Sequence, residues 1–72
     1  MEPFKRIVAL ARAIGVPSRL ALLQVVGEQG LSLTSAAATV GIAPSTAHRH
    51  LDQLVRVGLV TKTVKGRTSI YR

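Results

Sequence analysis

Residues 31–60 read LSLTSAAATVGIAPSTAHRHLDQLVRVGLV, and their apolar side chains recur at helical intervals in two short segments joined at Gly41. Thr34 can cap the first segment, residues 35–40, because its hydroxyl can accept a hydrogen bond from an unpaired backbone N–H of the first turn. Gly41 can end that helix at low cost, since glycine readily adopts the left-handed conformation. Two helices joined by such a short turn are typical of a helix-turn-helix.

The second segment, residues 44–57, predicts an amphipathic helix. Pro44 suits its first position, where a backbone N–H would have no partner and the fixed φ is already helical. Gly58 ends the helix, and Leu59 can fold back over the last turn. Residues spaced three or four apart form the expected buried stripe: Ala47, Leu51, Leu54 and Val55. The opposite face is polar and basic: Ser45, Thr46, His48, Arg49, Asp52, Gln53 and Arg56.

A helix is also expected near the start of the chain. Pro3 can open it, and it runs to about Ile14 with its cations Lys5, Arg6 and Arg12 facing water. The expected apolar band of this helix consists of Phe4, Ile7, Val8, Ala11 and Ile14.

A second helix follows. Ser18 can cap it, and Gly27 and Gly30 break it. Leu20, Leu23 and Val26, with the flanking residues 21, 22 and 25, form the densest apolar cluster of the chain. We therefore expect this cluster at the centre of the core.

The remaining segments predict strands. Residues 31–33 can form a short strand, and from residue 60 onward apolar and polar side chains alternate. Lys65–Gly66 predicts a tight turn, and residues 67–72 a return strand. The sequence thus predicts a mainly α fold with a small β-hairpin, a winged helix-turn-helix of about four helices in one domain over residues 1–72.

The charge distribution narrows the class of partner. Lys and Arg total 10 against 3 Asp and Glu, giving a formal net charge of +7, which favours a polyanion through long-range attraction and counterion release. DNA, RNA and an anionic membrane all fit the net charge alone. Six cations and one acid lie beyond the turn between the paired helices, which favours DNA. The cations are Arg49, Arg56, Lys62, Lys65, Arg67 and Arg72.

Other features exclude several classes. The chain has no cysteine, which excludes disulfides and thiolate metal sites and is consistent with a reducing, cytoplasmic setting. Its apolar runs are shorter than the roughly 20 residues that span a bilayer. The N-terminal segment does not fit a signal peptide, because Arg12 interrupts its apolar stretch. We therefore expect no membrane partner.

Three segments together carry a family resemblance: GVPSRLALLQVV, LSLTSAAATVGIAPSTAHRHLDQLVRVGLV and VKGRTSIYR. They resemble the winged-helix domain of ArsR-type bacterial and archaeal transcriptional repressors over roughly residues 4–72. The segment STAHRHL is also similar to the N-terminal domain of IclR-type regulators. The wing and Pro17–Arg19 favour the ArsR type.

The resemblance implies a homodimer that binds a partly palindromic operator on double-stranded DNA. One recognition helix, about residues 44–57, would enter the major groove at each half-site, and the wing, about residues 60–72, would reach backbone or minor groove. Members commonly dimerise through the first helix and a further C-terminal helix, which would begin at Tyr71–Arg72. A prokaryotic cytosol or nucleoid is the implied location.

The chain differs from typical ArsR-type proteins at two points. Many ArsR-type proteins sense metals through Cys, His or carboxylate clusters, whereas the two histidines of this chain point roughly 200° apart on one helix. We therefore expect no metal sensing and no cofactor. Ala43 stands where relatives usually carry a capping Ser or Thr, which weakens the start of the next helix by about 1 kcal/mol.

Arg49 is the main candidate for reading a base edge, because a guanidinium can donate two parallel hydrogen bonds to guanine; a phosphate contact is the alternative. Ser45 and Thr46 lie near the helix N-terminus, which favours phosphate. His48 is either a base reader or an exposed polar residue, whereas His50 points toward the second helix and packs there. The expected DNA-binding residues are Pro44, Ser45, Thr46, His48, Arg49, Lys62, Lys65 and Arg67.

Within the wing, Lys65 and Arg67 flank the turn and can approach phosphate or the minor groove. Lys62 and Arg72 either join them or only keep the hairpin soluble. We expect Tyr71 to pack against the helices rather than to stack on bases.

Other functions fit the sequence less well than DNA binding. Ser45, His48 and Asp52 share one helix face, but an exposed helix supplies neither the buried carboxylate nor the oxyanion donors of a catalytic triad, so no enzyme is expected. A winged helix that binds structured RNA or a protein remains an alternative, as does a non-specific DNA-organising protein. The scarcity of aromatic residues disfavours RNA, whose readers usually stack bases on aromatic side chains.

Overall fold

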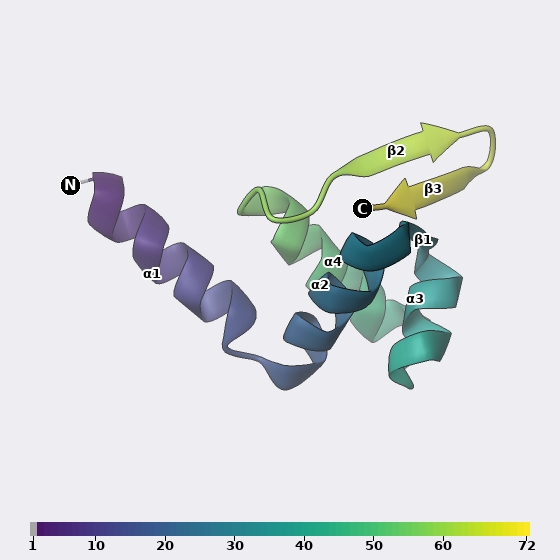
Figure 1. Ribbon diagram of the computed structural model, residues 1–72, viewed down its shortest axis with the longest axis horizontal. Helices are drawn as coiled ribbons and strands as arrows, with labels where there is room; N and C mark the ends of the chain where they lie inside the picture. The colour runs from purple at the N-terminus through teal and green to yellow at the C-terminus, as the bar shows by residue number, and fades with distance from the viewer. Residues whose placement is uncertain (1) are drawn as a thin grey trace.

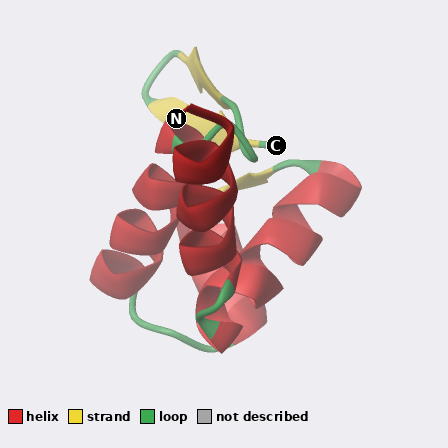
Figure 2. Cartoon of the chain, turned by 90° about the vertical axis from the view of Figure 1, so that its left-hand side faces the viewer, coloured by secondary structure: helices red, strands yellow, loops and turns green. Residues whose placement is uncertain are grey.

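The computed structural model describes the backbone of residues 2–72 and the side chains of residues 5–72 (Figure 1). Its helices are α1 (Glu2–Ile14), α2 (Pro17–Gln29), α3 (Leu33–Val40) and α4 (Pro44–Arg56), and its strands are β1 (Leu31–Ser32), β2 (Lys62–Lys65) and β3 (Thr68–Tyr71). Helices α2, α3 and α4 pack against one another, and Figure 2 shows the strands gathered at one end of the helices. The predicted winged helix-turn-helix is confirmed.

The core lies between α2, α3 and α4. On α2, Leu22 and Val26 are fully buried, whereas Leu20 is 48% exposed, so the prediction that Leu20 lies at the centre of the core was wrong. Residues 20–23 are all apolar, and such a run does not indicate which face of the helix points inward. The predicted stripe of α4 is confirmed, because Ala47, Leu51 and Leu54 are fully buried.

The helix starts differ from those expected. The N-cap of α3 is Ser32, whose Oγ accepts a hydrogen bond from the Ser35 N–H at 3.2 Å, rather than Thr34. Ser32 closes β1 in an extended conformation, and the helix therefore begins two residues earlier than predicted. Ser18 is not a cap either, since α2 begins at Pro17 after Val16. Proline in the first turn needs no N–H partner there.

Replacing Ser32 by alanine is expected to destabilise the protein by about 1 kcal/mol, because an N–H of the first turn of α3 loses its acceptor. Urea unfolding of both proteins at one concentration measures the difference. The matched control is Thr34→Ala, since Thr34 is exposed and helical, and it should change the free energy of unfolding by less than about 0.5 kcal/mol. A larger loss for Thr34→Ala than for Ser32→Ala would contradict the assigned cap.

The ends of α2 and α4 depend on glycine. Gly30 follows α2 with φ +69°, whereas Gly27 lies inside the helix and does not break it as predicted. Gly58 has φ +83° after α4, and its N–H donates to Val55 O at 3.0 Å. The Leu59 N–H donates to Leu54 O at 3.0 Å, so the expected fold-back cap is confirmed.

The sheet joins the wing to the helix-turn-helix. Its strand order is β1-β3-β2, so β3 is central and antiparallel to both neighbours. Tyr71 pairs with Leu31 on one side and Lys62 on the other. The two-residue turn is Gly66–Arg67, one position later than predicted, because Lys65 pairs with Thr68 and Gly66 takes the positive φ of +61°. The wing is thereby held against the start of α3.

Helix α1 projects from the rest of the fold (Figure 1). Among its described side chains, only Ala13 is buried. The expected apolar band is exposed to solvent, with Ile7 at 61% and Val8 at 45%, while the side chain of Phe4 lies outside the described residues. No single helix in the described part is long and apolar enough to cross a membrane; α1 and α2, bent by 91°, reach that length only when counted together.

Candidate nucleic-acid interface

Helix α4 begins without a side-chain cap. Ala43 is the N-cap residue, as the sequence predicted, and its methyl group cannot accept a hydrogen bond. Pro44 occupies the first turn, and the Ala47 N–H donates to Ala43 O at 2.9 Å. Ser45 is exposed and Thr46 is half-buried at this end of the helix. The positive end of the helix dipole therefore faces solvent beside a hydroxyl, an arrangement that suits an anion.

The outer face of α4 is exposed along its length. His48 and Arg49 are both exposed, with Arg49 near the middle of the helix. About two turns further on, Arg56 forms an ion pair with Asp52 at 3.3 Å, the single ion pair within residues 5–72. Arg49 thus keeps its guanidinium available for a partner, whereas Arg56 already has one.

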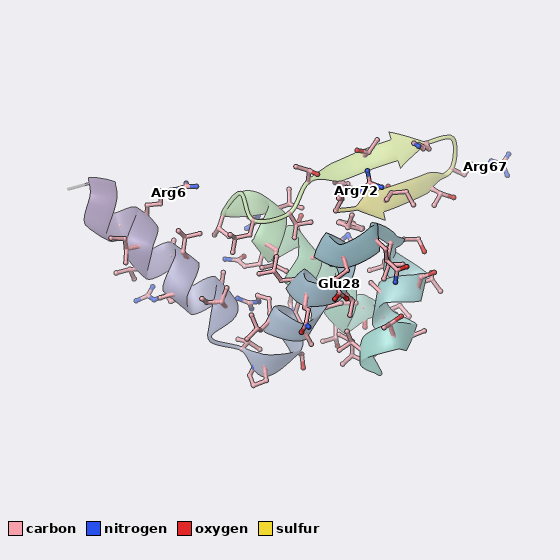
Figure 3. All side chains as sticks on the ribbon, viewed as in Figure 1. Arg6, Glu28, Arg67 and Arg72 are labelled. Atoms are coloured by element: carbon pink, nitrogen blue, oxygen red, sulfur yellow. The ribbon has the colours of Figure 1, made fainter. Side chains whose placement is uncertain are left out.

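The wing places its cations in two groups. Lys65 and Arg67 flank Gly66 at the tip, and Figure 3 shows Arg67 pointing away from the body of the molecule. Lys62 lies at the base, with its Nζ 5.8 Å from the centre of the Tyr71 ring, within cation–π distance. The Arg72 guanidinium lies against Gly30, where a Cβ would come within 2.8 Å of its Nε. The tip pair is therefore free of the contacts that engage the basal pair.

The structure brings two of the predicted groups to one end of the molecule. The amino-terminal end of α4 and the tip of the hairpin both lie at the end away from α1 (Figure 1). Tyr71 is buried at 3% exposure, as expected, and offers no stacking surface. All the predicted residues of α4 and the wing tip are exposed except Thr46, which is half-buried.

His50 behaves as predicted and also makes a contact that the sequence did not reveal. It is 8% exposed on the inner face of α4, and its Nδ1 accepts a hydrogen bond from Nε of Arg19 at 3.3 Å. Burial, and then the nearby charges of Arg19 and Arg49, lower the pKa of His50 below its usual value of 6.5. The imidazole is therefore neutral at neutral pH. The only sequence signal for this contact is the Pro–x–Arg motif, Pro17–Arg19, that opens α2.

No group of three or more His, Asp or Glu side chains comes together among the residues that the structure describes. His48 and His50 lie on opposite faces of α4, one exposed and one buried. The described part of the chain therefore offers no candidate metal site.

Fold and surface together define a winged helix-turn-helix DNA-binding domain. The helix-turn-helix domain family matches residues 9–63, more than half of the chain, and the chain belongs to this family. It is a family of DNA-binding regulators rather than of enzymes. No curated protein sequence matches the chain significantly.

Solved structures agree in fold. The homodimeric winged helix-turn-helix DNA-binding domain of Mb0332 from Mycobacterium bovis has a TM-score of 0.92 at 22% identity, over 99% of this chain and 66% of its own. An ArsR-like transcriptional regulator from Rhodococcus sp. RHA1 has a TM-score of 0.91 at 24% identity, over 100% and 68%. The transcriptional regulator HlyU from Vibrio vulnificus CMCP6 is 30% identical with a TM-score of 0.80, over 97% and 73%.

The chain therefore spans about two thirds to three quarters of the length of these neighbours. The predicted resemblance to ArsR-type regulators is confirmed.

Proposed function

We propose that the chain binds specific sequences of double-stranded DNA and acts as a transcriptional repressor in the prokaryotic cytosol or nucleoid. Helix α4 lies in the major groove, and the wing, residues 60–72, contacts the backbone or the minor groove. The observation that carries the proposal is the outer face of α4, exposed and cationic, on a helix whose opposite face is anchored in the core. Residues 1–72 act as one domain in this role.

In this proposal, some residues contact base edges and others contact phosphates. Arg49, exposed near the middle of α4 and outside the ion pair of Arg56, reads a base edge, with His48 beside it. Ser45 and Thr46, with Pro44 at the open end of the helix, hold a phosphate. Lys65 and Arg67 at the tip of the wing neutralise phosphates, and Lys62 supports them from the base.

The active form in this proposal is a homodimer joined through α1. A 72-residue domain buries only about 60–65% of the surface that its unfolded chain exposes, which leaves a thin margin of stability. The exposed apolar residues Ile7, Val8 and Ile14 give α1 an unpartnered surface that a second copy can cover. The Mycobacterium bovis neighbour, also a winged helix-turn-helix domain, is homodimeric.

Selection from a random duplex library tests the proposal. We expect enrichment of an inverted repeat whose half-sites are about 10–10.5 base pairs apart, one helical turn of B-DNA. Salt-sensitive binding to every duplex, with no sequence enriched, would instead indicate a DNA-organising protein. Preference for structured RNA over duplex DNA would contradict the proposal outright.

The wing contact has its own prediction. If Lys65 neutralises one phosphate in each subunit, Lys65→Ala should reduce the magnitude of the slope of log binding constant against log salt concentration by about 0.9 per subunit, or about 1.8 for the dimer. Titrations of the selected duplex at several salt concentrations give the slope. Lys5→Ala is the matched control, because Lys5 lies on the distant α1, and its slope should equal that of the unmodified protein. An unchanged slope for Lys65→Ala would remove this residue from the interface.

A further inference from the structure

Arg19 connects three helices through one guanidinium group. From its place in α2, its Nε donates to Nδ1 of His50 on α4 at 3.3 Å, and its Nη1 donates to the backbone O of Arg12 on α1 at 3.4 Å. Arg12 is in the last turn of α1, where carbonyl groups lack helical partners and a cation is favourable. Because the guanidinium is planar and rigid, displacing it from one partner also displaces it from the other.

The orientation of α1 depends on few other contacts. Ala13 is its one buried side chain in the described part, and Leu10 is half-buried. Arg6 reaches toward the end of α4 (Figure 3), with its Nη2 3.5 Å from the position that a Cβ would take on Gly58. Within residues 5–72, the side-chain hydrogen bond that reaches α1 is the one from Arg19. This bond therefore adds a directional restraint on α1 to the packing of Ala13 and Leu10.

The contact with His50 exists only while the ring is neutral, because Nδ1 must carry a lone pair in order to accept. Protonation would place an N–H opposite the Nε–H of Arg19 and would bring two positive charges together. The surrounding charges offer no compensation, since α3 has no charged residue and Glu28 lies nine residues, about 13 Å, along α2 from Arg19. Asp52, two residues further along α4, lies on the opposite, exposed face and is paired with Arg56 at 3.3 Å. The remaining charged groups of α1 and α4 within residues 5–72 are cationic: Lys5, Arg6, Arg12 and Arg49.

We propose that Arg19 is a positioning residue that holds α4 at a fixed angle to α1, and that protonation of His50 releases this hold. This inference rests on the proposed function, in which α1 joins two copies and α4 reads DNA. In such a dimer, the angle between α1 and α4 sets the distance between the two recognition helices. It thereby sets the half-site spacing that the protein accepts. Acid loosens that spacing through His50, a residue that does not face DNA.

The distance between two spin labels, measured without DNA, tests whether Arg19 fixes the angle of α1 to the other helices. The chain has no cysteine, so Ala9→Cys on α1 and Ala38→Cys on α3, both exposed, accept labels at those two positions alone. Labelled chains are diluted with unlabelled ones, so that only distances within one chain contribute. We expect one narrow distance distribution at about pH 8 and a clearly broader one at about pH 4.5, well below the usual histidine pKa of about 6.5, because burial shifts protonation of His50 to a lower pH. Equal widths at the two pH values would overturn the proposal.

Three variants distinguish the effect of His50 protonation from the effect of its packing. Arg19→Gln should give the broad distribution at both pH values. His50→Asn should stay narrow at both, because Asn carries an acceptor oxygen near the position of Nδ1 and does not titrate. His48→Asn is the control for the other histidine, which is exposed, and it should keep the pH response of the unmodified protein. A pH response that survives in His50→Asn would assign the effect to another group.

Binding to selected duplexes then tests the consequence for spacing. The unmodified protein at about pH 8 should prefer the selected duplex over one with a base pair inserted between the half-sites by at least about fivefold. Arg19→Gln should lose this preference, and so should the unmodified protein at about pH 4.5, well below the usual histidine pKa. If the library yields no site, the proposed function fails, while the label distances still decide the role of Arg19. If a site is found and Arg19→Gln keeps the preference, the positioning role fails alone.

Discussion

Replacing Leu51 by alanine is expected to lower the free energy of unfolding by about 2–5 kcal/mol, the largest effect of any substitution considered. Leu51 is fully buried in α4, inside the core that α2, α3 and α4 share, so its loss removes apolar contacts and leaves a cavity. A domain of 72 residues has a total stability of only about 4–11 kcal/mol. The substitution therefore removes a large part of the total free energy of unfolding. Urea unfolding followed by circular dichroism measures it.

The matched control is Leu20→Ala. Leu20 is 48% exposed on α2, so truncating it should cost about 1 kcal/mol or less. All proteins are compared at one chain concentration, because dimerisation makes the apparent stability depend on concentration. A loss for Leu20→Ala as large as that for Leu51→Ala would show that the core lies on the face of α2 that the sequence cluster suggested.

Arg49→Ala is expected to weaken binding to the selected duplex by about 1–3 kcal/mol per half-site and to blur the preference at one base pair of each half-site. The reason is the position of Arg49, exposed near the middle of α4, where a guanidinium can reach two acceptors of a guanine edge. Binding constants on the selected duplex, on its single-base variants and on random duplexes give both the loss and the change in preference.

Arg56→Ala is the matched control for Arg49→Ala. Arg56 lies on the same helix and is equally cationic, but it is paired with Asp52 at 3.3 Å. Its replacement should leave the base preference unchanged and alter affinity to a similar small extent on all duplexes. Equal weakening of selected and random duplexes by Arg49→Ala would make Arg49 a backbone contact rather than a base reader.

The sequence predicted the helix-turn-helix well because local chemistry dominates there. Gly41 and Gly58 take the positive φ values that stop helices, and Pro44 opens α4 as expected. The stripe that includes Leu51 and Leu54 has one helical period and a clearly polar opposite face, so only one orientation buries it well. For the same reason, the exposure of Arg49 could be predicted before the fold was known.

The cap of α3, the buried face of α2 and the position of the hairpin turn could not be predicted, because the sequence offers two nearly equivalent solutions for each. Ser32 and Thr34 are both competent caps, and the pairing of β1 with β3, forty residues away in the chain, decides in favour of Ser32. On α2, a run of four apolar residues left the buried face undetermined. In the hairpin, Gly66 could occupy either turn position, and the strand register places it first.

The contact between Arg19 and His50 could not be predicted from local pattern. The two residues are 31 positions apart, and each has a common alternative, a solvated cation and a packed histidine. Only the packing of α2 against α4 brings Nε of Arg19 to Nδ1 of His50. Contacts between residues so far apart in the chain cannot be predicted from its local sequence patterns.

The burial of Tyr71 gives the protein a built-in optical reporter. The chain contains one tyrosine and no tryptophan, so its intrinsic near-ultraviolet emission comes almost entirely from a single phenol ring. That ring lies in the central strand of the sheet, 3% exposed, with the Lys62 ammonium 5.8 Å from its centre. Any event that lifts the wing from the helices changes the surroundings of this one fluorophore, and it can be followed in real time without a dye.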